Sequence, residues 1–395
     1  MSNNGKFRKI TNVLFIFILI LILLTGFTVT VFFPDDINYY ENRYSNKIVM
    51  PTVDSISDSS FQNSIEDALA DQIPAAQRLK RYYNESISVF SDFFIKKIIK
   101  NNNADYINYK NGSIFFNGHY VYSPINLEES KKVLKSKAEN YNNIFTSYPD
   151  IDFYAYYIEK DTDINFENGE KINADDYIFS LLNIDDSKKR SFEINSFEEF
   201  SKYFYKTDHH WNHTGSYKAY KDLVDFLECD DKPIINKKEI LLSEKFAGSK
   251  AATAGSSILT EPFYAFEFDF PEFKTIKSST GDDYGKQSQL NSLKLNEPIS
   301  YGEYYGGDDG ELIFDTGKKD RDNILIIGES YDNAVLKLLA THFGKTFSID
   351  LRNYEHATGN KFNFKKYVKQ NKINKVLLIG NIDFYCLDTF ELEIN

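Results

Sequence analysis

Four consecutive residues, Asp208-His209-His210-Trp211, bring together a carboxylate, two imidazoles and the only tryptophan of the 395-residue chain. A serine hydroxyl becomes a useful nucleophile when a histidine takes its proton, and a carboxylate commonly holds that histidine in the required tautomer. An Asp-x-His spacing puts both side chains on the same side of an extended segment, so Asp208 can orient His210. The segment therefore predicts the base and the carboxylate of a Ser/His/Asp site, with Trp211 as a candidate for contact with a substrate.

The serine of this set is expected to be Ser330, in the segment NILIIGESYDNAVLKLL. An apolar run ends at Gly328, and the serine follows two residues later at the mouth of an expected helix. A helix start supplies backbone N–H donors that can stabilise an oxyanion. The alternative is an ordinary N-cap serine, because the full Gly-x-Ser-x-Gly elbow is absent and Asp332 stands at its last position.

The sequence around Ser330 predicts a parallel sheet covered by helices. Apolar runs and helical periods alternate there, which favours right-handed strand-helix-strand crossovers. Ligand sites in such sheets lie beyond the carboxyl ends of the strands. The expected strands are 323–327, 346–350 and 375–379, and the expected helices are 332–343 and 364–371.

Three polar residues, Ser330, Arg352 and Asn381, each follow one of these strands by a few positions. They should therefore meet at one edge of the sheet. Arg352 and Asn381 are candidate donors to an oxyanion or a substrate. Loop solvation is the alternative for both, as is a salt bridge from Arg352 to Asp350 or Glu355.

The part of the chain before the histidine motif shows further helical and extended patterns. Apolar spacings of three and four predict two helices within 61–100, broken at Pro74. A hairpin turn is expected at 110–113, where the sequence is KNGS, followed by a helix over 127–145 and a strand over 151–158.

Helices are also expected on both sides of the motif that begins at Asp208. The motif should then lie in a loop that enters a helix, with Asn212, Thr214 or Ser216 as its cap. From about residue 239 to 320 the pattern becomes irregular and turn-rich, which predicts a β-rich insertion.

The N-terminal region carries a charge-free, mainly apolar run at 13–33, long enough for a membrane span. Lys6, Arg8 and Lys9 precede the run and acidic residues follow it, which predicts a single-pass protein of the cell membrane with a cytoplasmic N-terminus. A cleaved signal peptide is the alternative, but the run exceeds a usual signal core and no small-x-small site follows. The expected parts are a cytoplasmic segment (1–12), an anchor (13–33), a tether and helical lead-in (34–100), and an extracellular α/β domain (101–395).

The formal net charge of −12 argues against nucleic acid or an anionic membrane surface as a partner. Neutral or amine-bearing glycans fit this charge better. Cys229 and Cys386 are the only cysteines, so one disulfide or two isolated thiols are possible. No nucleotide, flavin or haem signature occurs, so we expect no organic cofactor, and no resident metal is expected either.

Several motifs together resemble the DHHW proteins, relatives of the SGNH hydrolase-like domain of bacterial alginate O-acetylation proteins. They are YENR at 40–43, DQIP at 71–74, TDHHWN at 207–212, FAGS at 246–249, IGESYDN at 327–333 and DLRNY at 350–354. The resemblance implies a flavodoxin-like three-layer α/β/α domain in permuted order, with the Asp/His segment before the serine. It also implies a triad of Asp208, His210 and Ser330, and it assigns no catalytic role to His209.

The sequence departs from ordinary SGNH enzymes at two places. Gly328-Glu329-Ser330 stands where those enzymes have Gly-Asp-Ser, and GNID at 380–383 only loosely matches their Gly-x-Asn-Asp block. These departures affect the oxyanion assignment more than the triad.

The leading hypothesis is a serine O-acyltransferase or acetylesterase that acts on a cell-surface or exported polysaccharide. A transferase needs an acyl donor, which implies a polytopic membrane acyltransferase as partner. One alternative is a non-catalytic glycan-binding or scaffold protein with the same fold. Another is a metal-dependent phosphoesterase with Asp208, His209, His210 and His213 as ligands.

Overall fold

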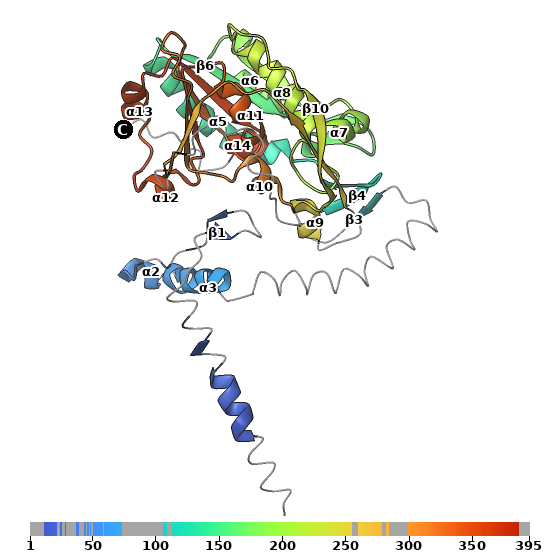
Figure 1. Cartoon of the computed structure of the whole chain (residues 1–395), viewed down its shortest axis with the longest axis vertical. Coiled ribbons are helices and arrows are strands. Elements are labelled where there is room, and N and C mark those ends of the chain that lie inside the picture. The colour runs from blue at the N-terminus through green and yellow to red at the C-terminus, as the bar shows by residue number, and fades with distance from the viewer. Residues whose placement is uncertain are drawn as a thin grey trace, which may run out of the picture. The chain divides into compact units, whose positions relative to one another are not determined.

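The computed structural model describes most of the region after residue 112 and selected segments before it (Figure 1). Two units are distinguished, 1–87 and 88–395, and each is described by itself. The described residues are 12–21, 24–25, 28, 37–38, 43–44, 46, 48, 50–57, 59–72, 106–108, 113–254, 260–278, 282–283 and 299–386.

Besides the helical residues 12–21, the described part of the first unit contains two helices and one small strand pair. Strands β1 (Ile37–Asn38) and β2 (Arg43–Tyr44) are antiparallel, and helices α2 (Val53–Ser57) and α3 (Ser60–Gln72) follow. Asp71 is buried and accepts hydrogen bonds from the backbone and side-chain amides of Asn46 at 2.8 and 3.0 Å. Helix α3 confirms the first helix expected within 61–100, and the second lies outside the described residues.

The structure corrects the prediction of a membrane anchor. No helix among the described residues is long and apolar enough to cross a membrane. A span needs about 20 consecutive helical residues, and the longest described helical stretch in the apolar run, residues 12–21, is shorter. The predicted single-pass membrane location is therefore wrong on this finding.

The second unit is built on an eight-stranded mixed sheet, in the order β13-β12-β14-β16-β15-β17-β6-β9. The last five strands of this order are mutually parallel, and the first three extend the sheet as an antiparallel edge. The parallel strands are β16 (Lys345–Ile349), β15 (Ile324–Ile327), β17 (Lys375–Gly380), β6 (Asp152–Ile158) and β9 (Lys189–Phe192). The antiparallel strands are β13 (Asp282–Asp283), β12 (Lys274–Lys277) and β14 (Glu311–Asp315).

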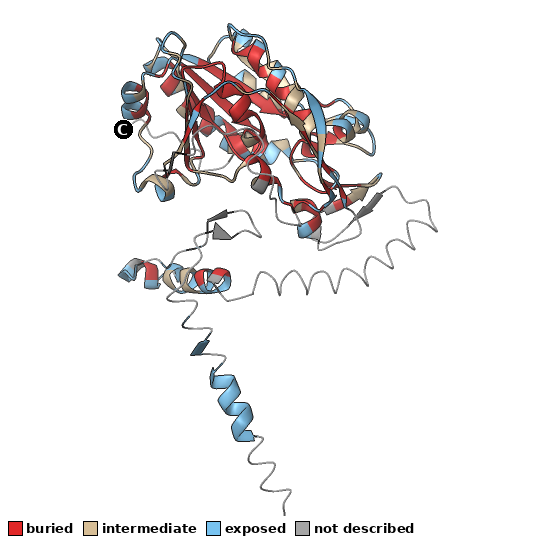
Figure 2. Cartoon of the chain, in the orientation of Figure 1, coloured by how far each residue is buried: buried red, intermediate tan, exposed pale blue. Residues whose placement is uncertain are grey.

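Helices cover both faces of the sheet, and the strands divide their side chains between two cores (Figure 2). On β6, Tyr154 and Tyr156 join one core, while Ala155 and Tyr157 join the other, as the two-residue period of a strand requires. Helices α8 (His213–Phe226) and α11 (Asn333–Ala340) pack in the first core. The second contains α5 (Leu127–Ser147), α6 (Ala174–Leu181), α13 (Phe364–Asn371) and α14 (Ile382–Cys386).

Burial on both faces explains why the central strands are continuous apolar runs. The predicted α/β class with a mostly parallel central sheet is confirmed, and the three expected strands after residue 320 match β15, β16 and β17 within one residue. In the predicted insertion, β12 and β14 join the central sheet, whereas β10 (Lys238–Phe246) and β11 (Glu261–Glu267) form a separate antiparallel pair.

Smaller elements complete the unit. Strands β3 (Tyr106–Asn108), β4 (Ser113–Phe116) and β5 (His119–Tyr122) form a meander, in which the first pair confirms the hairpin expected around 110–113. The remaining elements include β7 (Ile164–Asn165), β8 (Glu170–Lys171), α7 (Phe197–Tyr203), α9 (Ser249–Ala254), α10 (Tyr301–Tyr305), α12 (Tyr354–Thr358) and the 3₁₀ turns Asp161–Asp163 and Asp186–Lys188.

The strand order locates the edge where a ligand should bind. If the parallel strands are numbered from β15 through β16 and β17 to β6 and β9, their order reads 2-1-3-4-5, which is that of flavodoxin-like sheets. The order reverses between β15 and β17, and the crevice beyond the carboxyl ends of such strands is where ligands bind. Ser330 and Asn381 follow these two strands.

Candidate active site

The histidine motif lies in a tight loop between α7 and α8. Phe204 and Trp211 form an isolated antiparallel bridge, and the backbone N–H of Tyr205 donates to the carbonyl of His210 at 3.2 Å. Asn212 ends the loop as the cap of α8, because its side-chain Oδ1 accepts from the backbone N–H groups of Thr214 and Gly215 at 2.9 and 3.0 Å. The expected loop-to-helix placement is confirmed.

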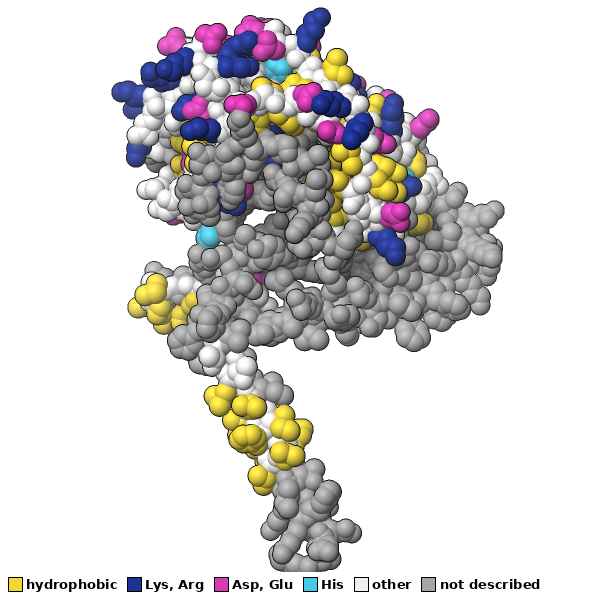
Figure 3. All heavy atoms as spheres, viewed as in Figure 1, with side chains coloured by type: hydrophobic (Ala, Val, Ile, Leu, Met, Phe, Trp, Pro, Cys, Tyr) yellow, Lys and Arg dark blue, Asp and Glu magenta, His cyan; other side chains and the backbone are white. Residues whose placement is uncertain are grey.

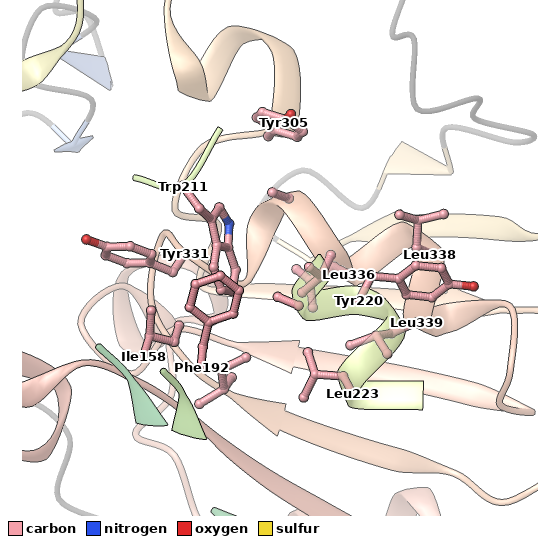
Figure 4. Close-up of a cluster of buried hydrophobic side chains, with 14 of the residues drawn as sticks. Ile158, Phe192, Trp211, Tyr220, Leu223, Tyr305, Tyr331, Leu336, Leu338 and Leu339 are labelled. Carbon is pink, nitrogen blue, oxygen red and sulfur yellow. The ribbon is translucent and has the colours of Figure 1, made fainter. Parts of the chain in front are cut away.

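Trp211 holds this loop to the core. Its side chain is fully buried and packs edge-on against Phe192 and Tyr331, with ring centroids 5.6 and 5.7 Å apart (Figure 4). Substrate contact was predicted for Trp211, but the structure leaves it no exposed surface and gives it a packing role.

The structure brings Asp208, His210 and Ser330 into one hydrogen-bonded chain. Asp208 Oδ1 lies 2.6 Å from His210 Nδ1, and His210 Nε2 lies 2.7 Å from Ser330 Oγ. All three residues are buried, with Ser330 the most exposed at 9%. A proton can therefore pass from the serine to the imidazole while the carboxylate fixes the opposite nitrogen.

Asp208 is held from three directions. Its Oδ1 also accepts from the backbone N–H of His210 at 3.0 Å, and its Oδ2 accepts from the backbone N–H of Ser249 at 2.7 Å. Burial alone would raise the pKa of Asp208, but the two neighbouring imidazoles and these hydrogen bonds hold it well below its ordinary value. The group is therefore a fixed carboxylate.

The FAGS segment can approach Asp208 because it has a glycine, Gly248, at the point of contact. A Cβ on Gly248 would lie 2.3 Å from both Cβ and Oδ2 of Asp208, which is too close for a non-bonded contact of a Cβ atom. The glycine N–H donates to Thr207 Oγ1 at 3.1 Å, and Thr207 is in turn bonded to Glu261 of β11 at 2.8 Å. Sequence reasoning found FAGS only through resemblance, and its local chemistry gave no signal.

Ser330 stands in the turn between β15 and α11. Gly328 lets this turn close, since a Cβ there would lie 2.4 Å from Asp332 Oδ2 and 2.9 Å from Ile379 Cγ2. The backbone N–H of Asp332 donates to the carbonyl of Glu329 at 2.9 Å, which places Ser330 at the bend. Burial and nearby carboxylates raise the pKa of Asp332 well above its ordinary value.

Asn381 and Glu329 are bonded to each other. Glu329 Oε1 accepts from Asn381 Nδ2 at 2.7 Å and from its backbone N–H at 3.2 Å, while Asn381 Oδ1 accepts from the N–H of Asp383 at 2.8 Å. Burial raises the pKa of Glu329 to about 7, against the opposing charge of nearby Lys160. Glu329 is thus a buried partner of Asn381, a role the sequence did not indicate.

Arg352 forms the salt bridge that was one of its two predicted alternatives. Its guanidinium donates to Asp350 through Nε at 3.0 and 3.1 Å and through Nη2 at 2.5 Å, and Nη2 also contacts Asp308 at 3.0 Å. Burial alone would lower the pKa of Arg352, but these carboxylates raise it above its ordinary value. The arginine lies at the expected sheet edge with its charge shared between two acids.

Two tyrosines enclose His210, and sequence reasoning missed both. The ring of Tyr301, at the start of α10, stacks on His210 with centroids 3.8 Å apart and an interplanar angle of 2°. Tyr331 lies 5.0 Å away on a tilted plane, and its hydroxyl donates to the carbonyl of His209 at 2.6 Å. Tyr331 could have been suspected because it adjoins Ser330, whereas nothing in the irregular region around Tyr301 pointed to it.

Within the described part of the chain, one group of side chains has metal-ligand character: Asp208, His209 and His210, whose ligand atoms lie within 4.8 Å of one another. The predicted fourth ligand, His213, instead has its Nε2 2.7 Å from Glu239 of β10. Asp208 and His210 are also bonded to each other and to Ser330, so the grouping is that of a proton relay.

The surface of the α/β unit carries charges of both signs. Acidic and basic side chains are interspersed over the face of the α/β unit in Figure 3. The expectation of no nucleic-acid partner rests on the net charge and stays a prediction.

A family model described as "DHHW protein" matches residues 96–349. The chain belongs to the DHHW family. This confirms the resemblance inferred from the motifs, since the matched segment contains both the histidine loop and Ser330.

The chain is also similar to solved structures, two of them with TM-scores above 0.5. PatB1 of Bacillus cereus, solved with a sulfonyl adduct, is 16% identical with a TM-score of 0.55, and covers 71% of this chain and 97% of its own. A DHHW family protein from Eubacterium siraeum is 18% identical with a TM-score of 0.52, and covers 73% and 96%. The O-acetyltransferase domain of Pseudomonas putida AlgJ matches at 9% identity and a TM-score of 0.37, covering 72% and 92%. A search of curated proteins finds no match.

Proposed function

We propose that this DHHW protein is a serine O-acyltransferase or acetylesterase that acts on a polysaccharide, with Ser330, His210 and Asp208 as its catalytic residues. The observation that carries the proposal is the pair of contacts at 2.6 and 2.7 Å that link the carboxylate, the imidazole and the serine hydroxyl. A fold-level likeness to an O-acetyltransferase domain agrees with it but carries none of the argument.

The relay assigns each residue one step. His210 Nε2 takes the proton of Ser330 as the serine oxygen attacks the acyl carbon of the donor, and returns it to the leaving group. Asp208 holds the imidazole and stabilises its positive form. A second hydroxyl then attacks the acyl-serine: water in an esterase, a sugar hydroxyl in a transferase.

The oxyanion donors proposed here are the backbone N–H groups at the turn that begins α11. Asn381 and Arg352, the candidates from sequence, are bonded to Glu329 and to Asp350. In this arrangement they position the strand ends. A substrate would have to displace one of these contacts to reach either donor.

The partners remain proposals of the same kind. A polysaccharide with free or acetylated hydroxyls is the substrate class, and a transferase additionally needs a supplier of activated acyl groups. The expected polytopic acyltransferase is one such supplier.

The test is covalent labelling of the purified protein. Incubation with p-nitrophenyl acetate, and separately with a sulfonyl fluoride, should add one acyl or sulfonyl group to Ser330, detected by intact mass and peptide mapping. Ser330→Ala and His210→Ala should remove both adducts, whereas Ser147→Ala, at an exposed serine that ends α5, should not.

Absence of both adducts in the parent protein would instead favour the alternative of a non-catalytic glycan-binding protein. That alternative predicts glycan binding that Ser330→Ala leaves unchanged.

A further inference from the structure

His209 is the one histidine of the motif that the relay does not use. Its side chain is 29% exposed, while those of Asp208 and His210 are 5% exposed. Its ring centroid lies 3.8 Å from that of His210, at an interplanar angle of 36°. The relay therefore has a second imidazole beside it, on its more exposed side.

One neighbour bonds to this ring and another to the backbone of the same residue. His209 Nδ1 lies 2.5 Å from Ser249 Oγ, and the carbonyl of His209 accepts from Tyr331 at 2.6 Å. Ser249 is itself tied to the relay, because its N–H donates to Asp208. Within the described part of the chain, the hydrogen bond of the His209 ring is made by Nδ1 and none is made by Nε2, and the side chain is partly exposed. One ring nitrogen is thus held and the other is left for a ligand.

The chemistry of that nitrogen selects the ligand. Burial and the adjacent His210 hold the pKa of His209 well below its ordinary value, so the ring is neutral and offers no charge to an anion. Depending on the tautomer, Nε2 is a donor or an acceptor. A hydroxyl group can bond to either form, whereas a carbonyl oxygen matches only one.

We infer that His209 Nε2 binds the hydroxyl group that attacks acyl-Ser330, which is a sugar hydroxyl or water. This inference rests on the proposed function and deepens it by giving the acyl acceptor a site. Ser249 is then a positioning residue, because it acts through the ring of His209.

The oxygen of the bound hydroxyl forms a bond to the acyl carbon, and its proton passes to His210 Nε2. When the tetrahedral adduct collapses, the bond between the acyl carbon and Ser330 Oγ breaks, and His210 returns the proton to that oxygen. His209 takes no net proton.

The experiment separates acylation from deacylation. Rapid mixing of the full chain with p-nitrophenyl acetate gives a burst, which reports acetylation of Ser330, and a steady phase, which reports its loss. The steady phase is repeated with added glycerol as a hydroxyl acceptor. The variants are His209→Ala, His209→Gln and Ser249→Ala, with His213→Ala as a matched histidine outside the relay.

For His209→Ala we expect an unchanged burst and a deacylation rate lowered about five- to tenfold, the value of one positioned hydrogen bond. The acetyl adduct should accumulate in the mass spectrum, and acceleration by glycerol should be lost. His209→Gln should recover part of the rate because an amide can also donate and accept. Ser249→Ala should raise the glycerol concentration needed for half-maximal acceleration.

The outcomes distinguish failure of the His209 acceptor site from failure of the proposed function. No burst in the parent protein would remove the proposed function and this inference with it. A burst with deacylation unchanged in His209→Ala would overturn the inference alone. Equal losses of burst rate and deacylation rate would show that His209 merely supports His210, which also overturns it.

Discussion

The substitution Gly248→Ala tests whether the carboxylate of the relay is placed by backbone packing. The added methyl group would sit 2.3 Å from Asp208 Cβ, which is fixed to the main chain and cannot move aside like the end of a flexible side chain. Gly248 is absent from the residues with positive φ, so the backbone itself accepts alanine. Any effect must therefore come through Asp208.

The magnitude follows from the contact that is lost. The bond from the Ser249 N–H to Asp208 Oδ2, at 2.7 Å, involves a charged acceptor, and such bonds contribute about 1.5–3 kcal/mol. If this energy supports the active geometry, kcat/KM should fall by roughly 10- to 150-fold. Displacement of a reacting group by about 1 Å has a cost of similar size, near 10²-fold. We expect about a 10²-fold loss.

The assay is hydrolysis of p-nitrophenyl acetate, with thermal unfolding measured on the same samples. Ala247→Ser is the control, since Ala247 is exposed and the change adds an atom in the same loop. A folded Gly248→Ala protein whose kcat/KM stays within threefold of the parent would refute the idea that this glycine sets the position of Asp208.

Three further tests probe the residues around the relay. Tyr301→Phe should keep kcat, because the ring stacked on His210 remains, whereas Tyr301→Ala should lower it about tenfold; equal losses in both, measured by steady-state kinetics, would contradict a stacking role. Burial raises the pKa of Glu329 from 4.5 to about 7 in the folded protein, so ionisation of this side chain lowers the free energy of unfolding as pH rises between these values. The free energy of unfolding of Glu329→Gln should therefore exceed that of the parent by an amount that grows by up to about 3 kcal/mol from pH 4.5 to 7. Urea unfolding at the two pH values measures this, and a difference between the two proteins that does not change with pH would contradict it. Lys250 and Asp161 form an ion pair in which both side chains are fully buried. Lys250→Met should lower the free energy of unfolding by about 3–5 kcal/mol, because it leaves the Asp161 carboxylate buried without its cation. Adding Asp161→Asn should restore part of this loss in urea unfolding, and no recovery would mean that the ion pair is not the cause.

Local patterns were sufficient for the parallel sheet. The strands after residue 320 are buried on both faces, so each is a short apolar run, and the helices between them carry a clear period. The same placement rule brought Ser330 to the correct edge. Asp208 and His210 could be paired because their spacing is local, and a hydrogen bond two residues apart needs no knowledge of the fold.

Contacts between distant segments could not be read from local patterns. The partner of Asp208 Oδ2 is the backbone N–H of Ser249, 41 residues away. The sequence of the segment that presents this N–H shows no helical or extended period. Asn381 was expected to face a substrate, yet its nearest acceptor is a carboxylate 52 residues earlier in the chain. The N-terminal prediction rested on hydropathy and flanking charge, and no helix among the described residues is long and apolar enough to cross a membrane.

The distance between His210 and Ser330 is set by the packing of two helices. The histidine loop leads directly into α8, the serine turn leads directly into α11, and the two helices share one core through residues such as Leu223 and Leu339 (Figure 4). Each helix therefore delivers its N-terminal end to the same place. Because helix N-termini favour negative charge, the start of α11 would stabilise the oxyanion proposed to form at Ser330. The contact spans 120 residues of sequence, and the packing of this helix pair does not depend on which segment comes first. A chain order with the histidine before the serine can accordingly build the same relay.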